Sequence, residues 1–182
     1  MESEANCVFG KCLKFDPTDG ADFIALSASQ LPTEQITVAT WVKVTSHANY
    51  RRFVVNRWEN NAGDWLLFSD NINWIWGIRG VGGGQVNKVA PHKNSLEWTF
   101  LVGTYDNAAN TQKFYVNGIE IGNPMDPGVV LTKASLTISD SASSPMTGWI
   151  DEVRIYSKAL TLAQIEQLYA LGLEKYSLAA KK

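Results

Sequence analysis

The sequence predicts an all-β fold with a single helix near its C-terminal end. Short runs in which apolar and polar residues alternate recur along most of the chain, and Gly, Asn, Asp and Pro bound them. Helical periodicity is absent until near the C-terminal end. Because successive side chains of a strand point to opposite faces, this alternation is typical of half-buried strands. At 182 residues, the chain has a usual length for one large β domain.

The clearest strand covers residues 36–44, in which Val38 and Val42 share one face while Ala39 and Trp41 share the other. The same alternation predicts strands at residues 72–78 and 98–105. Shorter strands are expected at residues 13–15, 23–26, 53–56, 65–68, 136–139 and 149–156. The Gly-rich stretch 80–84 is expected to form a mobile loop.

One hairpin follows from its turn residues. Asn117 and Gly118 readily adopt the positive φ angles that a type I′ turn requires. We therefore expect Val116 to face Ile119 and Tyr115 to face Glu120 across the hairpin, with Phe114 opposite Ile121.

The predicted helix begins after Thr161, with Gln164 at the capping-box position three residues later. Its buried stripe is expected to contain Leu162, Ile165, Leu168 and Tyr169. Gly172 is predicted to end the helix, because Gly favours the left-handed conformation found after many helices.

Composition excludes two classes of partner. Lys and Arg number 16 against 18 Asp and Glu, so no nucleic-acid partner is expected, since phosphate neutralisation needs a basic surplus. No apolar run approaches the length that a membrane span needs. Cys7 and Cys12 are close enough in sequence to form a disulfide if the segment turns, but two reduced thiols fit equally well.

Two segments near the end, GWIDEVRIY at 148–156 and ALTLAQI at 159–165, closely resemble the closing strand and short helix of laminin-G-like domains. Residues 9–16, 36–44 and 98–106 match further segments of that family in its order. The loop 17–21 is longer than the usual family turn. The resemblance implies a concanavalin A-like jelly roll of two antiparallel sheets, with first and last strands adjacent. One domain is expected over residues 1–172, and residues 173–182 are expected either to form a tail or linker or to add a second short helix.

Family members are mostly secreted or displayed on surfaces, as carbohydrate-binding or adhesive modules. The resemblance therefore implies an extracellular or cell-surface binding module. Residues 1–6 carry two Glu in place of a secretory signal, so the chain is either intracellular or the mature part of an exported protein. The resemblance favours export.

Related domains often hold a structural calcium ion near the opening loop, and the resemblance transfers this role to Asp16, Asp22 and Asp151. Asp19 lies in the altered loop. Calcium prefers hard oxygen ligands, which these carboxylates offer. The alternative is that the Asp residues stabilise turns.

A second cluster is expected to bind glycan, because sugars need an aromatic platform beside hydrogen-bonding groups. The candidate residues are Tyr50, Arg57, Trp58, Asn60, Asn61 and Trp65, with Arg51, Arg52, Glu59 and Asp64 nearby. The same region is rich in basic residues, including Arg79, Lys88, His92 and Lys93. These could attract an acidic sugar or form an ordinary solvated face.

Two further functions occur on this kind of sandwich, catalysis and protein adhesion. Glucanases on this kind of sandwich need paired acids that alternate along one strand, and Asp151 and Glu152 are instead adjacent. A catalytic role is therefore not expected. A module for protein adhesion or assembly, as at a cell surface, pilus or virion, is the alternative to glycan binding.

Overall fold

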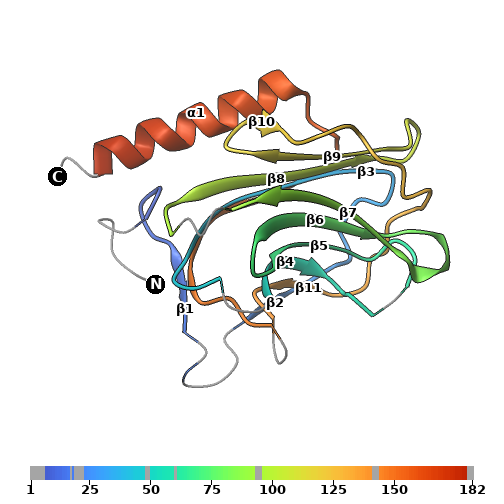
Figure 1. Ribbon diagram of the computed structural model, residues 1–182, viewed down its shortest axis with the longest axis horizontal. Coiled ribbons are helices and arrows are strands. Elements are labelled where there is room, and N and C mark those ends of the chain that lie inside the picture. The colour runs from blue at the N-terminus through green and yellow to red at the C-terminus, as the bar shows by residue number, and fades with distance from the viewer. Residues whose placement is uncertain are drawn as a thin grey trace.

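Two antiparallel sheets lie face to face in the computed structural model, and one long helix crosses the outer face of the first sheet (Figure 1). The structure describes residues 7–16, 18, 23–47, 50–59, 61–92, 96–140 and 144–179. The first sheet has the strand order β1-β12-β3-β8-β9-β10, and the second has the order β2-β11-β4-β5-β6-β7. The predicted two-sheet jelly roll is confirmed.

The first sheet contains β1 (Leu13–Phe15), β3 (Gln35–Val44), β8 (Thr99–Asp106), β9 (Thr111–Val116), β10 (Ile119–Glu120) and β12 (Gly148–Tyr156). The second contains β2 (Ile24–Leu26), β4 (Arg51–Asn56), β5 (Trp65–Ser69), β6 (Asn73–Arg79), β7 (Gln85–Pro91) and β11 (Leu136–Ile138). The helix α1 spans Leu162–Ala179, and a short 3-10 turn, η3, spans Val81–Gly83.

Each predicted strand is present close to its expected bounds. The first and last strands pair, with Leu13 opposite Ile150. The hairpin has the expected register, with Ile119 opposite Val116 and Glu120 opposite Tyr115. Asn117 and Gly118 have φ angles of 51° and 79°, as the type I′ turn requires.

Strand β7 was not predicted from the sequence. It follows the Gly-rich stretch and pairs with β6 at the edge of the second sheet. Its outer face carries Gln85, Asn87 and the exposed Val89, its inner face includes the buried Lys88, and it ends at Pro91, which an edge strand tolerates although proline has no N–H to donate to the ladder. A strand with a lysine facing inward and a valine facing outward lacks the apolar alternation on which the prediction depended.

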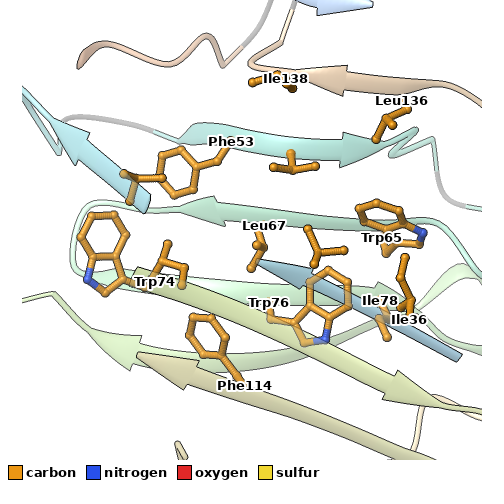
Figure 2. Packing of buried hydrophobic residues seen from close by; sticks show 14 of the residues in the cluster. Ile36, Phe53, Trp65, Leu67, Trp74, Trp76, Ile78, Phe114, Leu136 and Ile138 are labelled. Carbon is orange, nitrogen blue, oxygen red and sulfur yellow. The ribbon is translucent and has the colours of Figure 1, made fainter. Parts of the chain in front are cut away.

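The main core lies between the sheets (Figure 2). The labelled side chains of Phe53, Trp65, Leu67, Trp76 and Phe114 gather there, and all are fully buried. Two polar links join the sheets through this core. Trp76 Nε1 donates to the Thr104 carbonyl oxygen at 3.2 Å, and Gln112 Nε2 donates to the Trp76 carbonyl oxygen at 3.0 Å. These bonds satisfy groups that would otherwise be buried without partners.

A second apolar cluster lies outside the first sheet, beneath α1. Trp41 packs against Phe100 at 5.2 Å and Tyr169 at 5.6 Å between ring centroids. Strand β3 therefore has two buried faces, with Val38 and Val42 in the main core and Ala39 and Trp41 in this outer cluster. Residues 7–12 join the same cluster, where Cys7 and Cys12 form a disulfide with Cα atoms 5.3 Å apart.

The helix begins as predicted but does not end at Gly172. Thr161 N–H donates to Gln164 Oε1 at 3.0 Å, and Gln164 N–H donates to Thr161 Oγ1 at 3.4 Å, which completes the capping box. Gly172 lies inside α1, where an added Cβ would stand 2.5 Å from the Trp41 ring. Only glycine fits at this position, because the helix approaches Trp41 closely. The helix continues past residue 173, where the tail was predicted to begin.

Within the described part of the chain, no helix combines the length and the apolar character that crossing a membrane requires.

Gly103 gives a test of how closely the two sheets approach. An added Cβ there would lie 2.2 Å from Trp76 Cδ2, so Gly103→Ala must displace the indole. We expect the free energy of unfolding to fall by about 1–3 kcal/mol, the usual cost of overpacking. Urea denaturation measures it. Gly84→Ala is the matched control, because its Cβ would meet nothing within 4 Å. Equal stability of the two variants would contradict this account of the core.

Candidate functional site

A cleft of about 410 Å³ lies on the outer face of the second sheet. Strands β4 to β7 and the adjoining loops supply its walls. Its lining consists of Tyr50, Arg52, Trp58, Leu66, Phe68, Asp70, Ile75, Arg79, Gln85 and Asn87. Both aromatic and hydrogen-bonding side chains therefore face one hollow of small-molecule size.

The floor of the cleft is the outward face of strands whose inward face builds the core. On β5, Trp65 and Leu67 point into the core, and Leu66 and Phe68 belong to the outer cluster of the second sheet. Gly77 on β6 leaves room at the floor. An added Cβ at Gly77 would lie 2.7 Å from Asn87 Oδ1 and 3.1 Å from Trp58 Cη2. The bare backbone at this position lets Trp58 lie against the sheet.

The aromatic part of the cleft consists of Trp58 and Tyr50 around Phe68. The ring centroid of Phe68 is 6.4 Å from that of Trp58 and 6.0 Å from that of Tyr50. Tyr50 is 57% exposed and Trp58 is half-buried. These rings offer apolar surface to a ligand while remaining supported from below.

Arg79 lies over Trp58, with its guanidinium carbon 4.2 Å from the ring centroid. Its Nη1 donates to the Gly83 carbonyl oxygen at 3.0 Å. Its buried Nε has no hydrogen-bond partner among the residues that the structure describes. Burial lowers the pKa of Arg79, the charge of Asp64 opposes this, and the charge of Arg52 adds to it.

Asn87 supplies an acceptor beside this donor. Its Nδ2 donates to Gln85 Oε1 at 2.9 Å, while its buried Oδ1 has no partner in the described part of the chain. A buried polar atom without a partner costs free energy, so Arg79 Nε and Asn87 Oδ1 would each gain from a hydrogen bond that the described residues do not supply.

The loop that carries Trp58 is held by one buried carboxylate. Asp64 pairs with Arg57 at 3.0 Å, and its oxygens also accept from Glu59 N–H at 3.0 Å and Thr132 Oγ1 at 3.0 Å. Burial acts to raise the pKa of Asp64, but these hydrogen bonds and the Arg57 charge outweigh it, and the pKa lies below the ordinary value.

The structure brings together only part of the predicted glycan cluster. Tyr50 and Trp58 line the cleft. Arg57 pairs with Asp64 instead of lining the cleft, and Asn61 is exposed and donates to the Glu59 carbonyl oxygen. Trp65 is fully buried between the sheets (Figure 2), because the alternation of β5 turns it inward. Asn60 lies outside the described residues.

Sequence reasoning missed Asn87 and Gln85, and it treated Arg79 only as part of a diffuse basic region. Arg79 ends an otherwise apolar strand, and that position was the available signal. Gln85 and Asn87 alternate on β7, but this could have been interpreted only with the strand recognised.

Asp16 and Asp151, two of the three Asp residues predicted to bind calcium, do not come together in the structure. Asp16 follows Phe15, which pairs with Gly148, and Asp151 lies three residues further along β12. Four residues of strand separate the two positions by about 13 Å, too far for one ion. Asp22 lies outside the described residues. Among the described residues, no three His, Cys, Asp or Glu side chains are grouped so that they could hold a metal ion.

Asp16 and Asp151 each accept hydrogen bonds from other residues of the chain. Asp16 accepts from Thr18 Oγ1 at 2.8 Å. Asp151 Oδ2 accepts from Phe9 N–H at 2.8 Å, and its Oδ1 accepts from Glu152 N–H at 2.8 Å. Burial raises the pKa of Asp151, and these backbone donors only partly oppose it. In this structure Asp151 fastens the N-terminal segment to β12.

A sequence model of a protein family, described as the concanavalin A-like lectin/glucanases superfamily, matches residues 18–166. The chain belongs to this superfamily. The superfamily match covers every strand except β1, together with the start of α1. Comparison with curated proteins gave no match.

Solved structures with the superfamily's fold resemble the chain at low sequence identity. A heptameric SAP-like pentraxin from Limulus polyphemus has a TM-score of 0.66 at 15% identity, covering 87% of this chain and 80% of the pentraxin. A botulinum neurotoxin type C structure, from work on cell entry dependent on two ganglioside molecules, has a TM-score of 0.59 at 18% identity, covering 76% of this chain and 36% of that chain.

The binding domain of botulinum neurotoxin DC, in complex with rat synaptotagmin II, has a TM-score of 0.60 at 16% identity, covering 76% of this chain and 36% of that domain. The chain thus spans about a third of the toxin domains that it resembles. At these identities the likeness shows a shared fold.

Replacing Asp64 tests whether it holds the Trp58 loop. We expect Asp64→Ala to lower the free energy of unfolding at neutral pH by about 3–5 kcal/mol, because it leaves the partly buried Arg57 without its partner. A carboxylate with a depressed folded pKa stabilises the protein above its unfolded pKa, and this contribution is lost as pH falls through the folded value.

The stability gap between wild type and Asp64→Ala should therefore narrow below about pH 4. Urea titrations at neutral and acidic pH measure it. Asp126→Ala is a control at a carboxylate whose Oδ1 accepts the Gly128 N–H in an exposed turn. A stability difference between wild type and Asp64→Ala that does not change with pH would contradict the role of the Asp64 carboxylate in holding the loop.

Proposed function

We propose that this domain is a non-catalytic carbohydrate-binding module and that its glycan occupies the cleft over β4 to β7. One observation carries the proposal: Trp58 and Tyr50 lie in the same cleft as an unsatisfied donor on Arg79 and an unsatisfied acceptor on Asn87. Sugars combine apolar C–H faces with rims of hydroxyl groups. Such a ligand packs on aromatic rings and bonds to polar groups beside them.

The similar structures support a binding role. They include a neurotoxin whose cell entry depends on gangliosides, which carry sugars, and a pentraxin. The family is defined by lectins as well as glucanases. These relatives are distant in sequence, so the cleft itself is the main support.

The chemistry of the cleft favours binding over hydrolysis. Glycosidases use two carboxyl groups at a fixed separation. The cleft lining contains one, Asp70, and its Oδ1 accepts the N–H groups of Ile72 and Asn73 at 2.8 and 2.6 Å. A carboxylate bound in this way stabilises its own turn.

We also propose that the module acts outside the cell or at its surface. The Cys7–Cys12 disulfide supports this setting, because disulfides persist in oxidising compartments.

Protein adhesion or assembly is the second candidate. It is supported by the similar toxin domain, whose structure contains rat synaptotagmin II as a partner. Silence across a broad polysaccharide panel, together with self-association on a sizing column, would favour this candidate over glycan binding.

Structural calcium stays a proposal from the sequence, with Asp16 and Asp22 as the ligands that lie on the opening loop. A metal that binds only the folded state raises its stability. We therefore expect a higher thermal unfolding midpoint in Ca²⁺ than in EGTA. Identical midpoints would remove calcium from the description.

Trp58 is the critical test of glycan binding. We expect Trp58→Ala to weaken binding to a glycan found on an array by about tenfold or more, because stacking surface is lost. Calorimetric titration measures the affinity. Trp149→Ala is the matched control, since Trp149 is half-buried on the outer face of the first sheet beside Lys43. Equal binding by both variants would remove Trp58 from the site.

A further inference from the structure

The cleft contains an excess of positive charge. Its lining includes two guanidinium groups, on Arg52 and Arg79, and one carboxylate, on Asp70. The positive charge of Arg52 lowers the pKa of Arg79. The shape of a cleft with low-dielectric walls concentrates such a field.

Asp70 does not pair with either arginine. Its Oδ1 accepts two backbone N–H groups, and its Oδ2 accepts from Asn73 Nδ2 at 3.2 Å. The carboxylate is therefore directed into the turn at residues 70–73 and leaves both guanidinium groups to other partners.

Arg79 is a buried cation whose nearby carboxylate is already paired with another residue. It is 8% exposed, and it forms no ion pair with any residue that the structure describes. Asp64, whose charge favours protonated Arg79, is already paired with Arg57 at 3.0 Å. Burial of a cation without a counter-charge is unfavourable, and a bound anion would relieve it.

Arg52 adds a second cation from the neighbouring wall. One of its terminal nitrogens binds Asp140 at 2.9 Å, and its side chain is 23% exposed. A guanidinium group has five N–H donors, so the bond to Asp140 leaves others for a ligand. Planar guanidinium groups match the geometry of carboxylate and sulfate oxygens.

We infer that the cleft selects acidic glycans, with the carboxylate or sulfate of one sugar held by Arg79 and Arg52 while a sugar ring packs on Trp58 and Tyr50. This inference rests on the proposed glycan binding and names its ligand class. Arg79 and Asn87 both line the cleft, and Arg79 Nε and Asn87 Oδ1 are buried atoms without a hydrogen-bond partner among the described residues, so small movements of these side chains toward the ligand would satisfy both.

The test is an array of neutral, carboxylated and sulfated glycans printed as matched pairs that differ only in the acidic group. We expect the protein to bind acidic members and to bind their neutral partners at least tenfold more weakly. The pairs also distinguish carboxylate from sulfate recognition. Affinity should fall as salt rises, because screening weakens the attraction between ligand and cleft.

Variants then test which arginine recognises the acidic group of the glycan. Arg79→Gln and Arg52→Gln should each weaken binding to the best acidic glycan by about tenfold or more, as loss of a charge-assisted hydrogen bond implies. Arg79→Lys should keep part of the affinity, since it retains charge without the planar fork. Arg154→Gln, at a 40% exposed arginine side chain on the first sheet, is the control.

Each outcome is decisive. Arg79 also supports Trp58. If Arg79 had only this structural role, its replacement would weaken the binding of neutral and acidic glycans equally and leave the ratio of their affinities unchanged. An unchanged ratio in both Arg79→Gln and Arg52→Gln, or equal binding of neutral and acidic partners by the wild type, would overturn the inference while glycan binding stands. Silence of the whole array would overturn both proposals.

Discussion

Trp76 and the residues that contact it set the distance between the two sheets and, through β6, the position of the cleft. Its indole packs against Gly103, where no side chain could fit, and its Nε1 bonds to Thr104 on the opposite sheet. Gln112 returns a bond to the Trp76 carbonyl. These contacts hold β6 in register and orientation. Because side chains alternate, Gly77 and Arg79 then face away from the core.

The same strands serve stability on one face and recognition on the other. Inward residues such as Trp65 fill the core, and outward residues such as Phe68 form the cleft floor. A loop held by buried Asp64 then places Trp58 over Gly77. The cleft is polar where the loop and β7 meet, and its aromatic rings rest on a rigid sheet. A rigid sheet under the ligand lowers the ordering cost of binding.

Function in this family depends on what the fold carries on its outer surface, since one sandwich supports many activities. Here the outer face of the first sheet is covered by α1, whose Tyr169 stacks on Trp41. The outer face of the second sheet has no such cover over β4 to β7 in the described part of the chain, and the cleft lies there. The helix thus leaves one of the two faces for a ligand.

Local chemistry determined much of this protein from sequence. Alternation in residues 36–44, the Asn117–Gly118 turn and the Thr161–Gln164 capping box each depend on neighbours within a few residues, and each is confirmed. The family segments near residues 148–165 also fixed the fold class.

What only the tertiary structure decided concerns groups that meet across long separations. Trp65 follows the same alternation as its neighbours, yet which face is the core depends on the opposing sheet. Gly172 has the residue type of a helix end, but Trp41, far away in sequence, explains it. Arg79 and Trp58 meet because the loop between β4 and β5 folds over β6, the strand that carries Arg79. A sequence specifies local geometry directly, whereas which polar atom stays unsatisfied depends on every strand that packs around it.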